Sequence, residues 1–156
     1  MRFVSNRHAD SPSPSSGELP CDSTTRWGAV RVIARLGGLE RRDPGGGLTI
    51  HVAATRRARG RGLAGLPALA PGHALLLERC RSVHTAGMRF ALDLLWLDAA
   101  GAPVRLDRAV VARRLRGCRS ARAVLECNAG EGELFAQALR ATAAHQGARV
   151  VPGEHG

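Results

Sequence analysis

Two polar side chains in the middle of the sequence, His84 and Asp93, are candidates for catalysis. An imidazole acts as a general base when a carboxylate orients it. The pair therefore predicts a small hydrolase-like enzyme, with His84 as the base and Asp93 as its orienter. Asp93, however, lies among large apolar residues, and a buried carboxylate is costly unless polar partners surround it. We prefer a structural role for Asp93, as a group that locks the fold through ion pairs or backbone hydrogen bonds.

Arg61 is the candidate for recognising an anion. Its guanidinium group presents a rigid fork of donors that matches a carboxylate or a phosphate. It can instead form an ion pair inside the fold, with Asp93 or with Glu126, and this structural pairing is the preferred interpretation. If the side chains converge on one concave site, that site would hold a small anionic ligand or a partner segment. We expect the site to contain these residues: Arg61, His84, Thr85, Asp93 and Glu126.

A soft-metal site is a further alternative. Cys80, His84 and Met88 are spaced four residues apart, which on a helix would place sulfur and nitrogen donors suited to copper(I) on one face. Gly87 and the surrounding strand pattern argue against a helix, so we do not expect metal binding, even with Cys118 approaching from another strand. The four cysteines form no CxxC pair and match no zinc spacing. We predict no cofactor.

The charge balance is strongly basic, with 23 basic against 13 acidic residues and a net charge of +10. The densest cluster in the expected folded region spans residues 113–122, which suggests binding to phosphate or nucleic acid. All the basic residues are arginine, however, and Lys, Ile, Asn and Tyr are scarce or absent, as expected of a GC-rich genome. No aromatic residues are interleaved for base stacking. We expect a solvated loop there and do not favour nucleic-acid binding.

The elements that must position these side chains follow from the hydrophobic pattern. Residues 90–97 are apolar on both strand faces apart from Asp93, which predicts a central strand covered on both sides. Asp98 and Gly101 then predict a hairpin turn. Further strands are expected at 48–54, 74–77, 104–107 and 121–127, and helices at 56–61 and 133–145. This order predicts an α+β, mainly β fold: a compact antiparallel sheet or small barrel with one short helix after the first strand and a C-terminal helix.

The composition divides the chain into three parts. Residues 1–47 are expected to be a disordered, Ser/Pro-rich extension that contains a marginal element at 27–39 and ends in a Gly-rich linker. The folded domain is expected at 48–145, followed by a polar tail at 146–156. No apolar stretch is long enough for a secretory signal or a membrane span. We expect a cytoplasmic protein with reduced cysteines and no membrane partner.

Several ordered motifs resemble those of the DUF192 family of small bacterial and archaeal domains. The likeness covers about residue 48 to about residue 130. The motifs are Arg61-Gly62-Leu63-Ala64-Gly65, then Cys80-Arg81-Ser82-Val83-His84-Thr85-Ala86-Gly87-Met88-Arg89-Phe90-Ala91-Leu92-Asp93, Leu97-Asp98 with Gly101, and Val124-Leu125-Glu126 with Ala129-Gly130. The resemblance implies a small, mostly β fold with a helix after the first strand, and it implies no activity. The family's Gly-Asp turn before a last strand is absent here. We therefore expect the closing strand to be missing or replaced by the C-terminal helix.

The sequence favours a non-catalytic binding or accessory module with a small polar pocket, whose partner is a small anionic ligand or another protein. The alternative is the hydrolase-like or soft-metal-dependent enzyme that uses His84 and Asp93. Nonspecific nucleic-acid binding through the arginine-rich loops is the least favoured hypothesis. No phosphate-binding loop, dinucleotide fingerprint or nucleophile elbow is present in the sequence.

Overall fold

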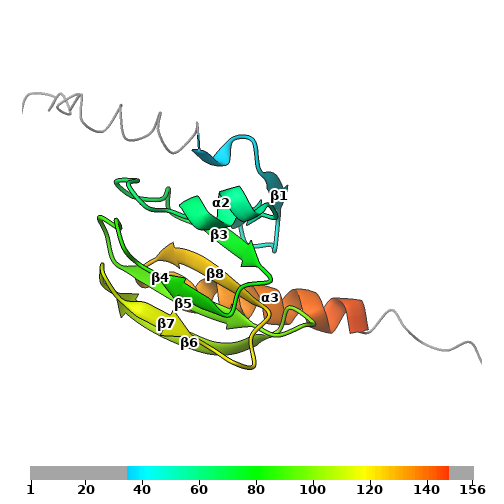
Figure 1. Cartoon of the computed structure of the whole chain (residues 1–156). Helices are drawn as coiled ribbons and strands as arrows, with labels where there is room; N and C mark the ends of the chain where they lie inside the picture. Colours follow the sequence, from blue (N-terminus) through cyan, green and yellow to red (C-terminus); the bar gives the residue numbers. More distant parts are fainter. Residues whose placement is uncertain (1–34, 148–156) are drawn as a thin grey trace, which may run out of the picture.

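The structure is a computed structural model that describes residues 35–147. A six-stranded sheet, a separate two-stranded sheet and helices α2 and α3 make up the described part of the chain (Figure 1). The elements are β1 (Glu40–Arg42), β2 (Thr49–Ala53), α2 (Arg56–Arg61), β3 (His73–Glu78), β4 (Ser82–His84), β5 (Leu92–Leu97), β6 (Pro103–Val110), β7 (Leu115–Gly117), β8 (Ala123–Asn128) and α3 (Gly132–Gly147). The predicted mainly β, α+β class is confirmed.

The six-stranded sheet is open and has the order β1-β2-β3-β8-β5-β6, while β4 and β7 pair with each other. Four of its neighbouring pairs are antiparallel, as predicted, but β2 and β3 are parallel. The parallel pair follows from α2, because the chain must cross over through the helix to re-enter the sheet in the same direction. The sheet is open, so the alternative of a small barrel is wrong, and the parallel pair is the one exception among the described pairs of the predicted antiparallel sheet.

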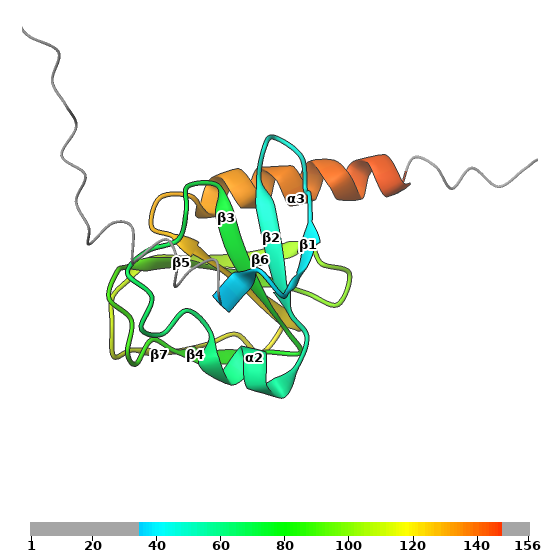
Figure 2. The ribbon, with the colours of Figure 1, turned by 90° about the horizontal axis from the view of Figure 1, so that it is seen from above.

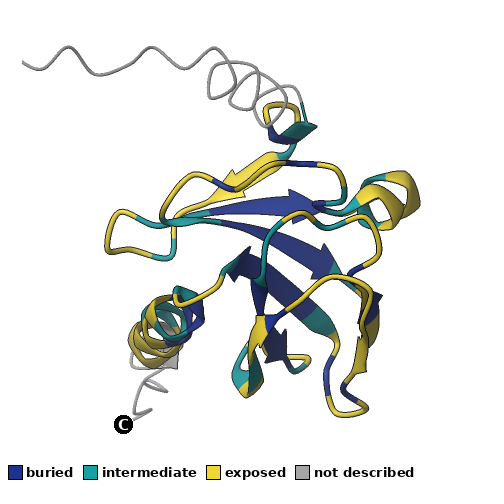
Figure 3. Cartoon of the chain, turned by 90° about the vertical axis from the view of Figure 1, so that its left-hand side faces the viewer, coloured by how far each residue is buried: buried dark blue, intermediate teal, exposed yellow. Residues whose placement is uncertain are grey.

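β5 lies inside the sheet between β8 and β6, and all six of its residues are buried (Figure 3). The apolar pattern of residues 90–97 predicted this covered central strand correctly. The reason is that both faces of the sheet are packed. Figure 2 shows α3 on one side of the sheet and α2, β4 and β7 on the other.

Two hydrophobic cores fill these two sides, and side chains alternate between them along each strand. The core on the α3 face contains Leu95, Leu125 and Phe135. The core on the α2 face contains Leu63, Leu75, Leu94 and Trp96. We call these sides the α3 face and the α2 face. Whether a residue has an odd or an even position in its strand decides which of the two faces its side chain reaches.

α2 begins and ends where the sequence predicts. Thr55 caps the helix, since its side-chain oxygen accepts a hydrogen bond from Ala58 N at 3.1 Å. Gly62 ends it, and its N–H donates to Ala58 O at 3.0 Å. The C-terminal helix expected at 133–145 spans 132–147, and no strand follows it within the described residues.

Three segments differ from the sequence expectations or lie outside the description. β1 falls inside the expected linker and pairs with β2, so the sheet begins before Leu48. Residues 115–117 form β7 within the basic stretch expected to be a loop, although their side chains stay exposed. Most of the marginal element at 27–39 lies outside the described residues, and so do most of the predicted extension and most of the predicted tail. Within 35–147, no helix is long and apolar enough to span a membrane.

Candidate functional site

Glu126 is a carboxyl group that the fold buries without giving it a full set of partners. The register of β8 places it opposite Leu75 and Leu94, on the α2 face. The residue is 5% exposed, and its Oε2 atom has no hydrogen-bond partner among the described residues. Burial raises the pKa of this carboxyl from 4.5 to about 7, because desolvation disfavours the charged form. Near neutral pH the group can therefore donate as well as accept a hydrogen bond.

A cavity of about 250 Å³ lies beside this carboxyl, and we call it the Glu126 cavity. Its walls come from the end of α2 and the turn that follows it, from β4, and from the ends of β3 and β8. Five residues that the sequence singled out line it together: Arg61, Cys80, His84, Met88 and Glu126. Of the predicted ligand-binding set, Thr85 and Asp93 do not line it. The tertiary structure therefore keeps part of the predicted site and separates the rest.

Gly62 lets the chain pass close over the carboxyl group. Its φ is +45°, in a region that L side chains rarely adopt. A Cβ atom at this position would lie 3.7 Å from Glu126 Oε2. The turn after α2 therefore forms a wall of the cavity with backbone atoms rather than with a side chain.

Cys80, His84 and Met88 share the Glu126 cavity although they do not lie on a helix. Cys80 Sγ donates a hydrogen bond to Ser82 O at 3.1 Å, and burial raises the pKa of the thiol. This favours the neutral thiol over the thiolate that binds metal. Within residues 35–147, no three His, Cys, Asp or Glu residues are grouped so that they could hold a metal ion. Cys118 lies outside the cavity, with its Sγ 3.3 Å from Ser120 Oγ.

Asp93 is buried on the opposite side of the sheet from Glu126. β5 pairs it with Cys127 on the α3 face, and the residue is 1% exposed. Its Oδ1 accepts a hydrogen bond from Ala109 N at 2.8 Å. Its Oδ2 accepts from Gly130 N at 2.9 Å and from Gly132 N at 3.0 Å. Both oxygens of this carboxylate therefore have backbone donors, which is the hydrogen-bonded form of the structural role preferred from the sequence.

The donors of Asp93 arise from irregular backbone. The pairing of β5 with β6 shifts register between Leu92 and Leu94, which leaves an extra residue in β6 opposite Asp93. Ala109 in this bulge has a φ of +49°, and a bulge leaves a residue outside the regular ladder. Asp93 accepts the amide hydrogen of Ala109, which the bulge places outside the regular ladder. It also ties β6 to the turn before α3.

Thr85 has a structural position rather than a place in the cavity. It is buried, and its hydroxyl donates to Val111 O at 2.7 Å and accepts from Arg114 N at 2.9 Å. These bonds join the end of β4 to the loop before β7. Thr85 therefore uses its polar group within the fold.

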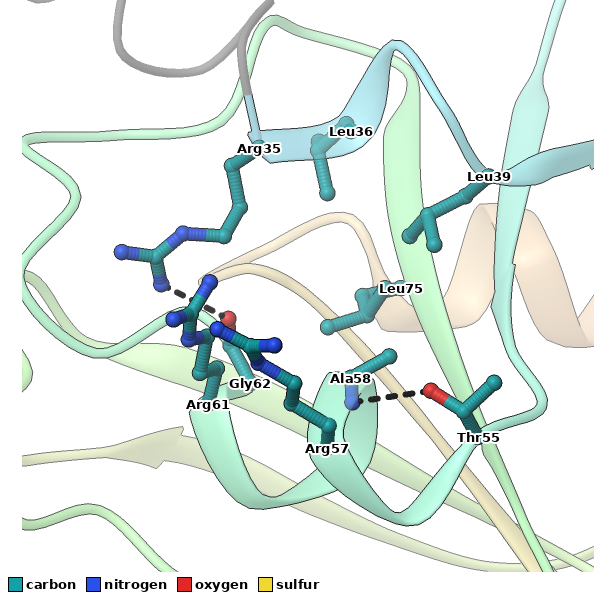
Figure 4. Close-up of a pocket in the computed structure, with 9 residues that line it drawn as sticks. All are labelled: Arg35, Leu36, Leu39, Thr55, Arg57, Ala58, Arg61, Gly62 and Leu75. Carbon is teal, nitrogen blue, oxygen red and sulfur yellow. Dashed lines mark hydrogen bonds between the residues drawn. The ribbon is translucent and has the colours of Figure 1, made fainter.

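Arg61 does not pair with Asp93 or Glu126, contrary to the preferred interpretation of the sequence. None of the ion pairs among the described residues involves it. Figure 4 shows its side chain directed toward Arg35 and Arg57, at a second cavity of about 180 Å³ that adjoins the first. Neither Arg35 nor Arg57 was predicted as a site residue; the sequence favoured a solvated surface for the basic stretch that contains Arg57. No local motif marks Arg35, which reaches α2 only because residues 35–39 fold over it.

Solved structures with a similar fold come from two bacteria. One is a candidate transcription regulator from Sinorhizobium meliloti 1021, with 25% identity and a TM-score of 0.51 over 56% of this chain and 74% of that one. Another is a protein of unknown function from Novosphingobium aromaticivorans DSM 12444, with 15% identity and a TM-score of 0.51 over 65% of this chain and 89% of that one. The comparison with curated proteins gave no match.

A family model for DUF192, described as "Uncharacterized ACR", matches residues 39–137, which is more than half of the chain. The matched segment runs from the start of the sheet to the first turns of α3. It includes both buried carboxyl groups, the turn at Gly62 and the segment from His84 to Asp93. The chain therefore belongs to the DUF192 family.

Proposed function

We propose that the protein is a non-catalytic binding module that holds a small polar ligand in the Glu126 cavity. The observation that carries the proposal is Glu126 itself. Burying a polar group without a hydrogen bond costs free energy, and Glu126 Oε2 is buried and has no partner among the described residues. A ligand that donates a hydrogen bond to this atom would recover that cost.

The rest of the lining suggests the kind of ligand. Arg59 and Arg61 are the charged residues of the lining besides Glu126, and Leu77, Val83 and Met88 contribute apolar surface. A ligand that carries both an anionic group and a hydrogen-bond donor complements this mixture. The cavity is smaller than the roughly 300–1,000 Å³ of sites for drug-sized molecules. A molecule of amino-acid or sugar-acid size is therefore the proposed ligand class.

The catalytic alternative loses its proposed pair of residues. His84 lines the Glu126 cavity from β4, whereas the Asp93 carboxylate is held on the α3 face by three amides. A base needs its orienting group within hydrogen-bond reach. We therefore do not carry the His84–Asp93 enzyme forward as a second proposal.

DNA-linked regulation is the function suggested by the name of the Sinorhizobium meliloti protein. In this chain α2 and α3 cover opposite faces of the sheet (Figure 2). A helix-turn-helix motif needs two helices packed against each other so that one enters the DNA groove. These two helices therefore do not supply such a motif, and the binding module remains our proposal.

A thermal-shift panel of amino acids, sugar acids and nucleotides tests the proposal on the full chain. One class should raise the melting temperature. At about 100-fold excess over the dissociation constant the gain is about 2.7 kcal/mol, or roughly 5–10 °C for a protein of this size. His84→Ala should fold normally, since His84 is exposed, and should lose the shift. Glu126→Leu removes the acceptor and should lose it as well.

His145→Ala provides the matched control, because His145 is also exposed but lies on α3, on the other face. This variant should keep the shift. A panel that moves nothing, or a shift that survives both cavity variants, would contradict the proposal.

A further inference from the structure

The second cavity, between residues 35–39 and α2, has a different chemical character from the Glu126 cavity. It measures about 180 Å³ and shares only Arg61 and Gly62 with the Glu126 cavity. Three of its lining residues are arginines and none is acidic. Figure 4 shows the guanidinium groups of Arg35, Arg57 and Arg61 gathered on one side of this space. We call it the triple-arginine cavity.

The three positive charges have no carboxylate partner within the described residues. The ion pairs found there use Arg42, Arg105, Arg108 and Arg140 instead. Like charges held close together repel each other, and a pair four residues apart on a helix, such as Arg57 and Arg61, destabilises the helix. An anion bound between the three groups would relieve this repulsion.

The position of Arg35 shows that the cluster is not a property of α2 alone. Its Nη1 donates to Gly62 O at 3.3 Å and to Ala64 O at 3.1 Å. These bonds hold the guanidinium beside the end of α2, and no other described residue accepts from its remaining N–H donors. An arginine-rich composition explains many arginines along a helix. It does not explain why a residue from a separate segment is held against them.

The opposite wall of the cavity is apolar. Leu36, Leu39 and Leu75 lie on the side away from the guanidinium groups in Figure 4. Leu36 and Leu75 are buried and belong to the core of the α2 face. The only lining hydroxyl, that of Thr55, already caps the helix through Ala58 N. The cavity therefore offers positive charge at one end and aliphatic contact at the other.

The geometry points to a second binding site in the triple-arginine cavity, specific for a phosphate monoester with a short aliphatic body. A phosphate monoester carries a charge of about −1.5 to −2 at neutral pH on three acceptor oxygens. Three guanidinium forks can share these oxygens, whereas a carboxylate offers two oxygens and one charge. The aliphatic body would lie against the leucines. The site shares Arg61 and Gly62 with the Glu126 cavity but contains neither Glu126 nor His84, so it does not depend on the ligand proposed there.

Isothermal titration of the full chain with propyl phosphate, inorganic phosphate and butyrate tests this inference. Propyl phosphate should bind with the lowest dissociation constant. Inorganic phosphate should bind more weakly because it lacks the aliphatic contact, and butyrate should bind more weakly because it lacks the charge. Arg57→Gln should raise the dissociation constant of propyl phosphate by about 10-fold or more, because a charged hydrogen bond is lost.

Two variants keep this test specific. Arg56→Gln removes the same charge from the neighbouring position of α2, which does not line the cavity, and should leave the dissociation constant unchanged. Glu126→Leu should also leave it unchanged, which separates this site from the proposed function. Circular dichroism should confirm that each variant is folded.

Three results would overturn the inference. The first is the absence of saturable binding of propyl phosphate in the millimolar range. The second is an equal loss in Arg56→Gln and Arg57→Gln, which would show general attraction to positive charge. The third is butyrate binding as tightly as propyl phosphate, which would rule out the phosphate assignment.

Discussion

Asp93 and Glu126 are two buried carboxyl residues on neighbouring strands of one sheet, and they differ in the hydrogen-bond partners that the fold gives to their oxygens. Asp93 is 1% exposed and Glu126 is 5% exposed. Asp93 accepts hydrogen bonds from three backbone amides, whereas Glu126 Oε2 has no partner among the described residues. Burial alone therefore does not identify a functional carboxyl. The difference lies in whether the surrounding backbone supplies donors.

The environments of the two carboxyl groups differ because different segments of the chain pack on the two faces of the sheet. On the α3 face, a bulge in β6 and the turn before α3 leave amide hydrogens that need an acceptor. On the α2 face, the turn at Gly62 passes over Glu126 and leaves a cavity instead of donors. One face thus uses its carboxyl to complete the backbone, and the other leaves its carboxyl available to a ligand.

The largest expected effect comes from Asp93→Asn. In Asn an NH2 group replaces one of the two carboxylate oxygens, Oδ1 or Oδ2. This NH2 group would face a backbone N–H donor, so at least one donor loses its hydrogen-bond partner. We expect a loss of about 3–5 kcal/mol in the free energy of unfolding, the cost of removing one side of a buried charged contact. Urea denaturation measures it. Asp98→Asn is the control, since Asp98 also accepts two backbone N–H groups but in a partly exposed turn, and it should lose about 1 kcal/mol. Equal losses in the two variants would break the comparison.

The next effect is the pH dependence of Glu126. Its pKa rises from 4.5 to about 7 on folding, so between these values the unfolded chain loses a proton that the folded chain retains. Stability from this group is therefore complete below about pH 4.5 and decreases by about 3 kcal/mol as the pH rises to about 7. Glu126→Gln should abolish this decrease. The check is urea denaturation of both proteins at about pH 5 and about pH 8.

Glu133→Gln is the control for that experiment, because Glu133 forms only surface ion pairs with Arg108 and Arg140. It should retain the pH dependence of the unsubstituted protein. Parallel stability curves for the protein and Glu126→Gln would show that Glu126 is not held in the state we describe.

Gly132→Ala tests the packing around Asp93 without changing its charge. A Cβ atom at Gly132 would lie 2.5 Å from Leu106 Cδ1 and 3.0 Å from Asp93 Oδ2. Overpacking of this kind costs about 1–3 kcal/mol, and a thermal melt would detect it. Gly60→Ala is the opposite case, because nothing lies within 4 Å of its Cβ position in α2. It should stabilise the protein by about 0.5–1 kcal/mol, and destabilisation there would contradict the packing described for α2.

The smallest effect concerns a basic pair on the α2 side of the sheet. His51 Nε2 lies 3.0 Å from His73 Nδ1, and burial, followed by the charges of His73 and Arg41, lowers the pKa of His51. Stability from His51 is therefore present above its unfolded pKa of about 6.5 and is lost as the pH falls below it. This sign is opposite to that of Glu126. His51→Gln should lessen the loss of stability between about pH 7 and about pH 5, and an unchanged loss would show that His51 is protonated freely in the folded state.

Much of the fold could be predicted from local patterns. The apolar run at 90–97 identified β5, and Thr55 and Gly62 marked the ends of α2, because capping and strand patterning act over a few residues. The parallel pairing of β2 and β3 was not predicted, since it depends on where the chain returns after α2. β1 was missed because its three exposed residues show no hydrophobic pattern.

For the candidate site, the sequence by itself determined the family motifs and the presence of Arg61, His84 and Glu126 as polar candidates. It left Asp93 with two interpretations, of which the structural one was preferred. Only the tertiary structure decided which of the candidates meet. Successive residues of a strand point to opposite faces, so Asp93 and Glu126 face opposite sides, although their strands are paired. The meeting of Arg35 with Arg57 and Arg61 depends on residues 35–39 folding over α2. Contacts between distant segments follow from packing of the whole chain, and no spacing within the sequence encodes them.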